Sequence, residues 1–90
     1  MESNEIKELI IDLFSPSDDV MFADGFDEAL IGFDPNFWRV IYSRSKAIQI
    51  LIDRDGMDDE EAVEYAEFNV FGAYIGEKTP VWVEDFLWNN

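Results

Sequence analysis

The stretch from Ser43 to Gly76 constrains the fold of this chain more than any other. Ser43 is a good helix N-cap, and the apolar residues after it form one wide face: Ala47, Ile48, Ile50, Leu51 and Ile52. Asp55-Gly56 then provides a left-handed stop. Asp58, with Glu61 three residues later, matches a capping box that opens a second helix. The stretch therefore predicts two helices joined by a tight turn.

The second helix is predicted to continue to Gly76, where a glycine stops it. Its expected buried stripe has helical spacing and comprises Ala62, Val63, Ala66, Val70 and Ala73. Tyr65 and Phe68 flank this stripe. Asn69 falls close to it, and a buried amide must be hydrogen-bonded. We therefore expect Asn69 to tie the helix to a neighbouring backbone.

The rest of the chain predicts one more helix and three strands. Residues 3–14 have the apolar spacing of an amphipathic helix. The runs Glu28–Phe33 and Trp38–Tyr42 flank an Asp-Pro-Asn turn and read as a β-hairpin, in which Trp38, Val40 and Tyr42 share a face. Val81–Glu84 follows a proline and is a third strand.

These elements predict an α+β fold in one domain, residues 1–90. The order is α-β-β-α-α-β, with about three helices and a small, mostly antiparallel sheet of about three strands. The last residues, Phe86–Asn90, carry three large apolar side chains. This tail either covers the core or docks against a partner.

The composition removes several classes of chemistry. The chain has no cysteine and no histidine, which excludes disulfides, thiolate zinc sites and Cys- or His-based nucleophiles. Asp53-Arg54-Asp55-Gly56 is similar to the start of an EF-hand loop, but Leu51 and Ala62 occupy two required ligand positions. The carboxylates of the turns between residues 24 and 34 lack an accompanying phosphate-binding loop. We predict no catalytic residue, no cofactor and no metal ion.

Charge is the strongest compositional feature. Twenty-one Asp and Glu oppose six Lys and Arg, giving a formal net charge of −15. Direct nucleic-acid binding and binding to anionic membranes both require clustered cations, so neither is expected. The N-terminus is acidic and no apolar run could span a bilayer, so we expect an intracellular protein. Such charge either attracts a basic protein surface or keeps the chain in solution.

The carboxylates of the second predicted helix form the first candidate site. Glu60, Glu64 and Glu67 stand at i, i+4 and i+7 and line one face. Their spacing resembles that of phosphates along a nucleic-acid strand, which suggests DNA mimicry; the alternative is a solvated face. The predicted partner-binding residues are Asp58, Asp59, Glu60, Glu64 and Glu67, with Trp88 as an apolar anchor.

The second candidate site is basic. Ser43, Arg44, Ser45 and Lys46 lie at a predicted helix N-terminus, where free N–H groups favour anions. They would make the chain a phosphate or nucleotide binder. The alternative is that these cations pair with the surrounding carboxylates. A third hypothesis is a structural protein that self-associates, as a homodimer, through the aromatic tail.

The segment Asp53–Glu84, DRDGMDDEEAVEYAEFNVFGAYIGEKTPVWVE, resembles small uncharacterised proteins encoded by tailed bacteriophages. They share a DGM turn, an EEAVEY helix and an FNV-x-GAY-x-GE-x-TP segment. The resemblance reaches back to about Asp24 and brings no activity with it. It implies a phage protein in the host bacterial cytoplasm. The leading hypothesis is thus a non-enzymatic accessory protein that binds and modulates a host nucleic-acid-handling protein.

Overall fold

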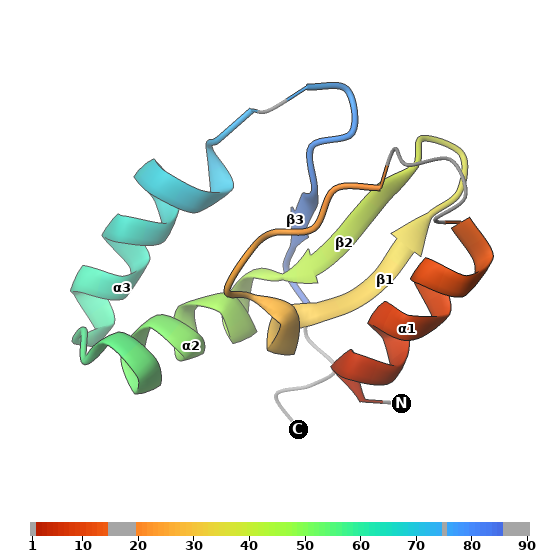
Figure 1. Cartoon of the computed structure of the whole chain (residues 1–90). Helices are drawn as coiled ribbons and strands as arrows, with labels where there is room; N and C mark the ends of the chain where they lie inside the picture. Colours follow the sequence, from red (N-terminus) through yellow and green to blue (C-terminus); the bar gives the residue numbers. More distant parts are fainter. Residues whose placement is uncertain (1, 15–19, 75, 86–90) are drawn as a thin grey trace.

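The order of helices and strands is the predicted one. The structure is a computed structural model that describes residues 2–14, 20–74 and 76–85. Within these residues it contains α1 (Ser3–Phe14), β1 (Leu30–Asp34), β2 (Arg39–Ser43), α2 (Arg44–Asp55), α3 (Asp59–Ala66) and β3 (Val81–Val83). A 3-10 turn, η2 (Asp27–Ala29), precedes β1, and a π-helical turn, η3 (Glu67–Phe71), follows α3. The α+β fold class is therefore confirmed (Figure 1).

The sheet is mixed, with strand order β1-β2-β3. β1 and β2 form the predicted antiparallel hairpin, in which Phe33 faces Val40 and Asp34 faces Arg39. β3 instead runs parallel to β2, with Tyr42 beside Trp82. The α2–α3 hairpin forms the crossover between β2 and β3. It brings the chain back to the end of the sheet where β2 began, so that β3 runs in the same direction as β2, as parallel pairing requires. Pairing in the sheet is thus antiparallel on one side of β2 and parallel on the other.

The predicted strand boundaries differ from the observed ones by one or two residues. Glu28 and Ala29, which were expected to begin the first strand, belong to η2, so β1 starts at Leu30. Trp38 lies in the hairpin turn with a φ of 55° and not in β2. Its ring still packs on the expected side, with its centroid 5.5 Å from that of Phe33. A left-handed residue at this point closes the turn, and packing of the indole compensates for the unusual backbone.

The core is one connected cluster centred on the sheet. Val40 and Tyr42 are fully buried on one face of β2, as the strand alternation predicted. Leu30 of β1, Ile10 of α1 and Leu51 of α2 join the same cluster. Helices α1 and α2 thus both reach the cluster that forms on this face of the sheet, with α1 lying alongside β1 (Figure 1).

Tyr42 is the largest fully buried side chain. Its ring stacks on Trp82 at a centroid distance of 4.7 Å, and its hydroxyl oxygen accepts a hydrogen bond of 2.7 Å from the Ala23 N–H. Burial raises the pKa of the Tyr42 phenol to about 12, because the charged form would lose its hydration. Tyr42 therefore connects β2 to β3 through ring stacking and to the segment before η2 through a hydrogen bond.

Candidate partner-binding surface

Local capping sets the position of α3. The Ser43 hydroxyl caps α2, Gly56 ends it with a φ of 72°, and the predicted capping box opens α3. In that box Asp58 Oδ1 accepts from the Glu61 N–H at 2.8 Å, and Glu61 Oε1 accepts from the Asp58 N–H at 3.2 Å. The turn predicted from these residues is confirmed. It folds α3 back against α2, so that the two helices form a hairpin (Figure 1).

The second helix does not reach Gly76. Its α-helical part ends at Ala66, and η3 carries the chain only to Phe71. Gly72 follows, and a Cβ there would lie 3.1 Å from the Glu67 carbonyl oxygen, so glycine permits this exit. Asn69, which we expected to be buried, is exposed, and its Nδ2 donates to the Tyr65 carbonyl of its own helix at 3.2 Å. Among the described residues, the Asn69 side chain therefore makes no hydrogen bond that ties the helix to a neighbouring element.

The buried stripe of α3 is much narrower than predicted. Ala62 and Ala66 are fully buried, whereas Val63 is 44% exposed. Tyr65 and Phe68 flank the buried positions as expected, but they are 44% and 79% exposed. The side chains of Ala62 and Ala66 are only methyl groups, so α3 can contact α2 without burying its larger side chains. The outer face of α3 and η3 therefore displays apolar side chains beside its carboxylates.

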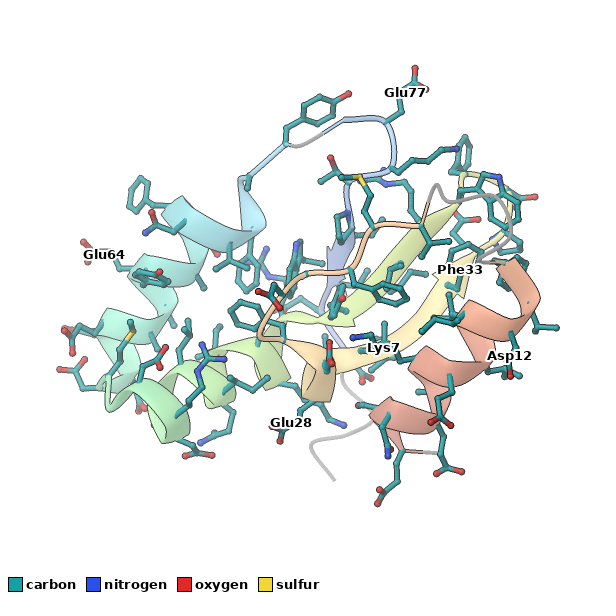
Figure 2. All side chains as sticks on the ribbon, viewed as in Figure 1. Lys7, Asp12, Glu28, Phe33, Glu64 and Glu77 are labelled. Atoms are coloured by element: carbon teal, nitrogen blue, oxygen red, sulfur yellow. The ribbon has the colours of Figure 1, made fainter. Side chains whose placement is uncertain are left out.

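Three of the predicted carboxylates lie on this outer face. Asp59, Glu60 and Glu64 are exposed, and none has an ion-pair partner among the described residues. Glu64 points outward from α3 on the side away from the sheet (Figure 2). Glu60 and Glu64 lie four residues apart, about 6 Å along the helix axis. We name Asp59, Glu60 and Glu64 the α3 acidic face.

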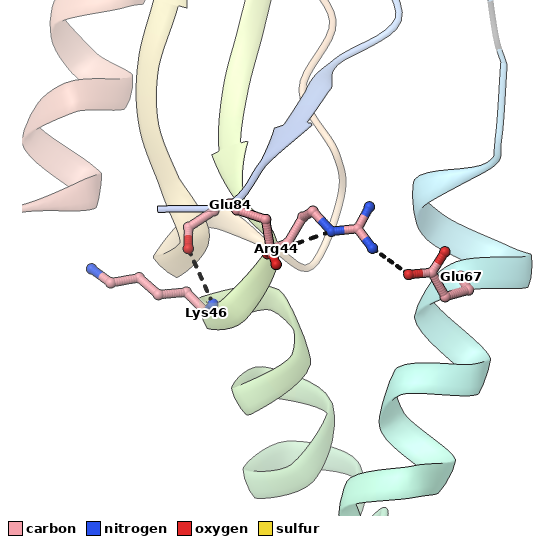
Figure 3. A network of polar contacts seen from close by, with 5 residues as sticks. Arg44, Lys46, Glu67 and Glu84 are labelled. Atoms are coloured by element: carbon pink, nitrogen blue, oxygen red, sulfur yellow. Dashed lines mark hydrogen bonds and ion pairs between the residues drawn. The ribbon is translucent and has the colours of Figure 1, made fainter. Parts of the chain in front are cut away.

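The other two predicted carboxylates have structural partners. Asp58 is exposed, but its carboxylate holds the capping box. Glu67 forms an ion pair with Arg44 at the start of α2. The Nε of Arg44 also lies 3.6 Å from Glu84 Oε1, just after β3 (Figure 3). Its guanidinium lies over the Phe71 ring, 4.2 Å from the ring centroid. Arg44 thus fastens η3 to α2 and the end of β3.

The predicted anion-binding residues occupy the start of α2. Ser43 is fully buried, and its Oγ accepts from the Lys46 N–H at 3.2 Å. Arg44 is engaged as described, while Ser45 and Lys46 are partly exposed. An open cavity of about 700 Å³ adjoins Lys46, but Glu2, Asp27 and Glu28 also line it, so its charge disfavours an anion. Binding of a phosphate here stays a prediction.

Trp88 and the rest of the predicted docking tail lie outside the described residues. A homodimer formed through this tail therefore stays a prediction. Within the described ranges, no three carboxylates are gathered in a way that could hold a metal ion. No helix there is long and apolar enough to cross a membrane.

Comparisons with models of known protein families, with curated proteins and with solved structures found no match to this chain. The likeness to phage proteins therefore stays a prediction from the sequence.

Proposed function

We propose that this chain is a non-enzymatic phage accessory protein that binds a basic surface on a host nucleic-acid-handling protein and changes its activity. The binding site is the α3 acidic face, and the proposed setting is the host bacterial cytoplasm. The observation that carries this proposal is the exposure of Asp59, Glu60 and Glu64 without an ion-pair partner among the described residues.

Physical reasoning supports a protein partner of positive charge. Like charges at i, i+4 on a helix repel by a few tenths of a kcal/mol, so the α3 acidic face costs stability when only water faces it. A basic partner removes that repulsion on binding. The net charge of −15 also accelerates association with such a partner over long range, and salt screens the effect.

DNA mimicry is the form of this binding that the proposal favours. The exposed carboxylates of α3, of which Glu60 and Glu64 lie about 6 Å apart along the helix axis, present negative charge in the way that a phosphate backbone does. A surface that binds phosphates with Lys and Arg is therefore the chemically matched target. Such a protein would compete with nucleic acid for its target, which is how binding would modulate the target's activity.

The test is a pull-down from bacterial lysate at low and high salt, followed by competition with DNA or RNA. We expect the full chain to retain a nucleic-acid-binding protein at low salt, to release it at high salt, and to compete with nucleic acid for the purified target. A target that binds the chain and nucleic acid simultaneously would contradict mimicry. Retention that salt does not weaken would contradict the electrostatic mode.

A further inference from the structure

A recurring arrangement holds cations on this molecule. Lys7 Nζ lies 2.9 Å from Asp27 Oδ2 and 5.0 Å from the centroid of the Phe22 ring. Arg54 pairs with Asp55 through two contacts of 3.0 Å, and its guanidinium lies 5.5 Å from the Phe26 centroid. In each case one carboxylate and one phenyl ring share a single cation.

Arg44 gives a third and more informative case, in which a second carboxylate, that of Glu84, also lies 3.6 Å from its Nε. It pairs with Glu67 and lies over Phe71, two residues that stand four apart on η3. Residues four apart on a helix share a face, so the carboxylate and the ring can meet one guanidinium together. Here the guanidinium comes from α2, and the pair on η3 acts as its receptor.

A second carboxylate–phenyl pair with the same spacing lies three residues earlier in the chain and is exposed. Glu64 and Phe68 are also four residues apart, both are exposed, and Phe68 is 79% exposed. Neither has an ion-pair or ring partner among the described residues. The neighbouring candidate, Glu61 with Tyr65, differs because the Glu61 carboxylate is held in the capping box.

We propose that Glu64 and Phe68 form a receptor for an arginine side chain of the bound partner. This inference rests on the proposed function and names the group that the α3 surface recognises. The guanidinium of the partner pairs with the Glu64 carboxylate through its N–H groups while its plane lies over the Phe68 ring. Lys7 shows that an ammonium can also lie near a carboxylate and a ring. A planar guanidinium, however, can stack flat on the ring while its N–H groups pair with the carboxylate, whereas an ammonium is more strongly hydrated and does not stack.

The charge of the chain argues for a foreign partner and against a second copy of itself. A second copy would bring 21 Asp and Glu but only six Lys and Arg. Three of those cations, Lys7, Arg44 and Arg54, are already paired with carboxylates of their own chain. An arginine-bearing basic protein is therefore the complementary occupant.

The test compares two peptides of equal charge, octa-arginine and octa-lysine, by fluorescence anisotropy at low ionic strength. The variants are Phe68→Leu and Glu64→Gln. The matched controls are Phe37→Leu, a phenylalanine that is 66% exposed in the hairpin turn, and Asp12→Asn, an exposed carboxylate on α1. Far-ultraviolet circular dichroism checks that each variant is folded.

We expect the wild-type chain to bind octa-arginine about two- to fivefold more tightly than octa-lysine, the range of an exposed cation–π contact. Phe68→Leu and Glu64→Gln should each bring this ratio close to one, while the two controls keep it. A ratio near one in the wild-type chain would overturn the inference, and so would an unchanged ratio in Phe68→Leu. Reversal of charge on the α3 acidic face tests the proposed function separately. Suppose that this reversal abolishes binding to the host target while Phe68→Leu keeps the arginine preference. The proposed function would then stand, and only the arginine receptor would be wrong.

Discussion

The β2 strand and the α3 helix have opposite relationships to the interior of this protein. β2 buries Val40 and Tyr42 completely and is surrounded by the other strands and by the aromatic ring of Trp82. α3 buries only two alanines, Ala62 and Ala66, and exposes every larger side chain that it carries. Large apolar side chains therefore hold the first region in place. The second is held by a cap, a glycine turn and a close helix contact.

This difference indicates where change is tolerated and where function can be placed. A surface that contributes little packing can carry like charges and exposed rings without unfolding the domain. The same surface is positioned precisely, because the capping box and Arg44 fix α3 at both ends. A weakly packed helix that is held at both ends suits recognition of a partner.

The largest effect is expected from the buried side of this comparison. Leu30→Ala removes a fully buried side chain from the sheet and should lower the free energy of unfolding by about 2 to 5 kcal/mol. Urea denaturation measures it. Leu13→Ala, on the outer side of α1 and 62% exposed, is the matched control and should change stability by less than about 0.5 kcal/mol. Equal losses in both variants would contradict the assignment of the core.

Tyr42 makes the core sensitive to high pH. Its folded pKa of about 12 lies above the ordinary value of 10.0, so the folded state holds the proton more tightly. Stability from this group is present in full below pH 10 and is lost as the pH rises toward 12, amounting to roughly 2 to 3 kcal/mol. Unfolding measured between pH 9 and 12 should show this loss in the wild-type chain and not in Tyr42→Phe. Parallel pH profiles for the two chains would be inconsistent with a buried phenol.

Enlarging a buried alanine tests how α3 is attached. Ala66→Leu forces extra atoms between α3 and α2, which should cost about 1 to 3 kcal/mol and accelerate hydrogen exchange across α3. Ala73→Leu is the matched control, because Ala73 is exposed after η3. If exchange in α3 were as slow in Ala66→Leu as in the wild-type chain, the close helix contact would not be what holds it.

The smallest effect concerns two adjacent aspartates. Asp58→Ala removes the N-cap of α3 and should cost about 1 kcal/mol. Asp59→Ala, one residue later, removes a solvent-exposed carboxylate near the helix N-terminus and should cost only a few tenths of a kcal/mol. Thermal denaturation of both variants distinguishes the roles. A larger loss for Asp59→Ala would show that the cap contributes less than the charge.

The parts of the fold that follow from local chemistry could be predicted from the sequence. Ser43, Gly56 and Asp58 act on backbone groups within a few residues, so the boundaries of α2 and the start of α3 were correct. The hairpin followed from its turn residues in the same way. The parallel pairing of β3 depends on how a long crossover returns to the sheet, which no local pattern specifies.

The candidate surface could be predicted only in part. The outward direction of Glu60 and Glu64 followed from helical periodicity. The pairing of Glu67 did not, because its partner Arg44 lies 23 residues away and meets it only through the hairpin. The flanking position of Phe68 was predicted, but its 79% exposure was not, since periodicity gives the direction of a side chain and not the width of the surface that it would pack against.

The central claim is that the α3 acidic face, and not net charge alone, binds the basic partner. The most direct measurement compares Glu60→Lys/Glu64→Lys with Glu8→Lys/Asp12→Lys, an exposed pair with the same spacing on α1. Both variants change the net charge equally. Binding of the captured host protein, measured by isothermal titration calorimetry, should be lost in the α3 variant and largely kept in the α1 variant. Equal weakening in both, or intact binding in the α3 variant, would contradict the account.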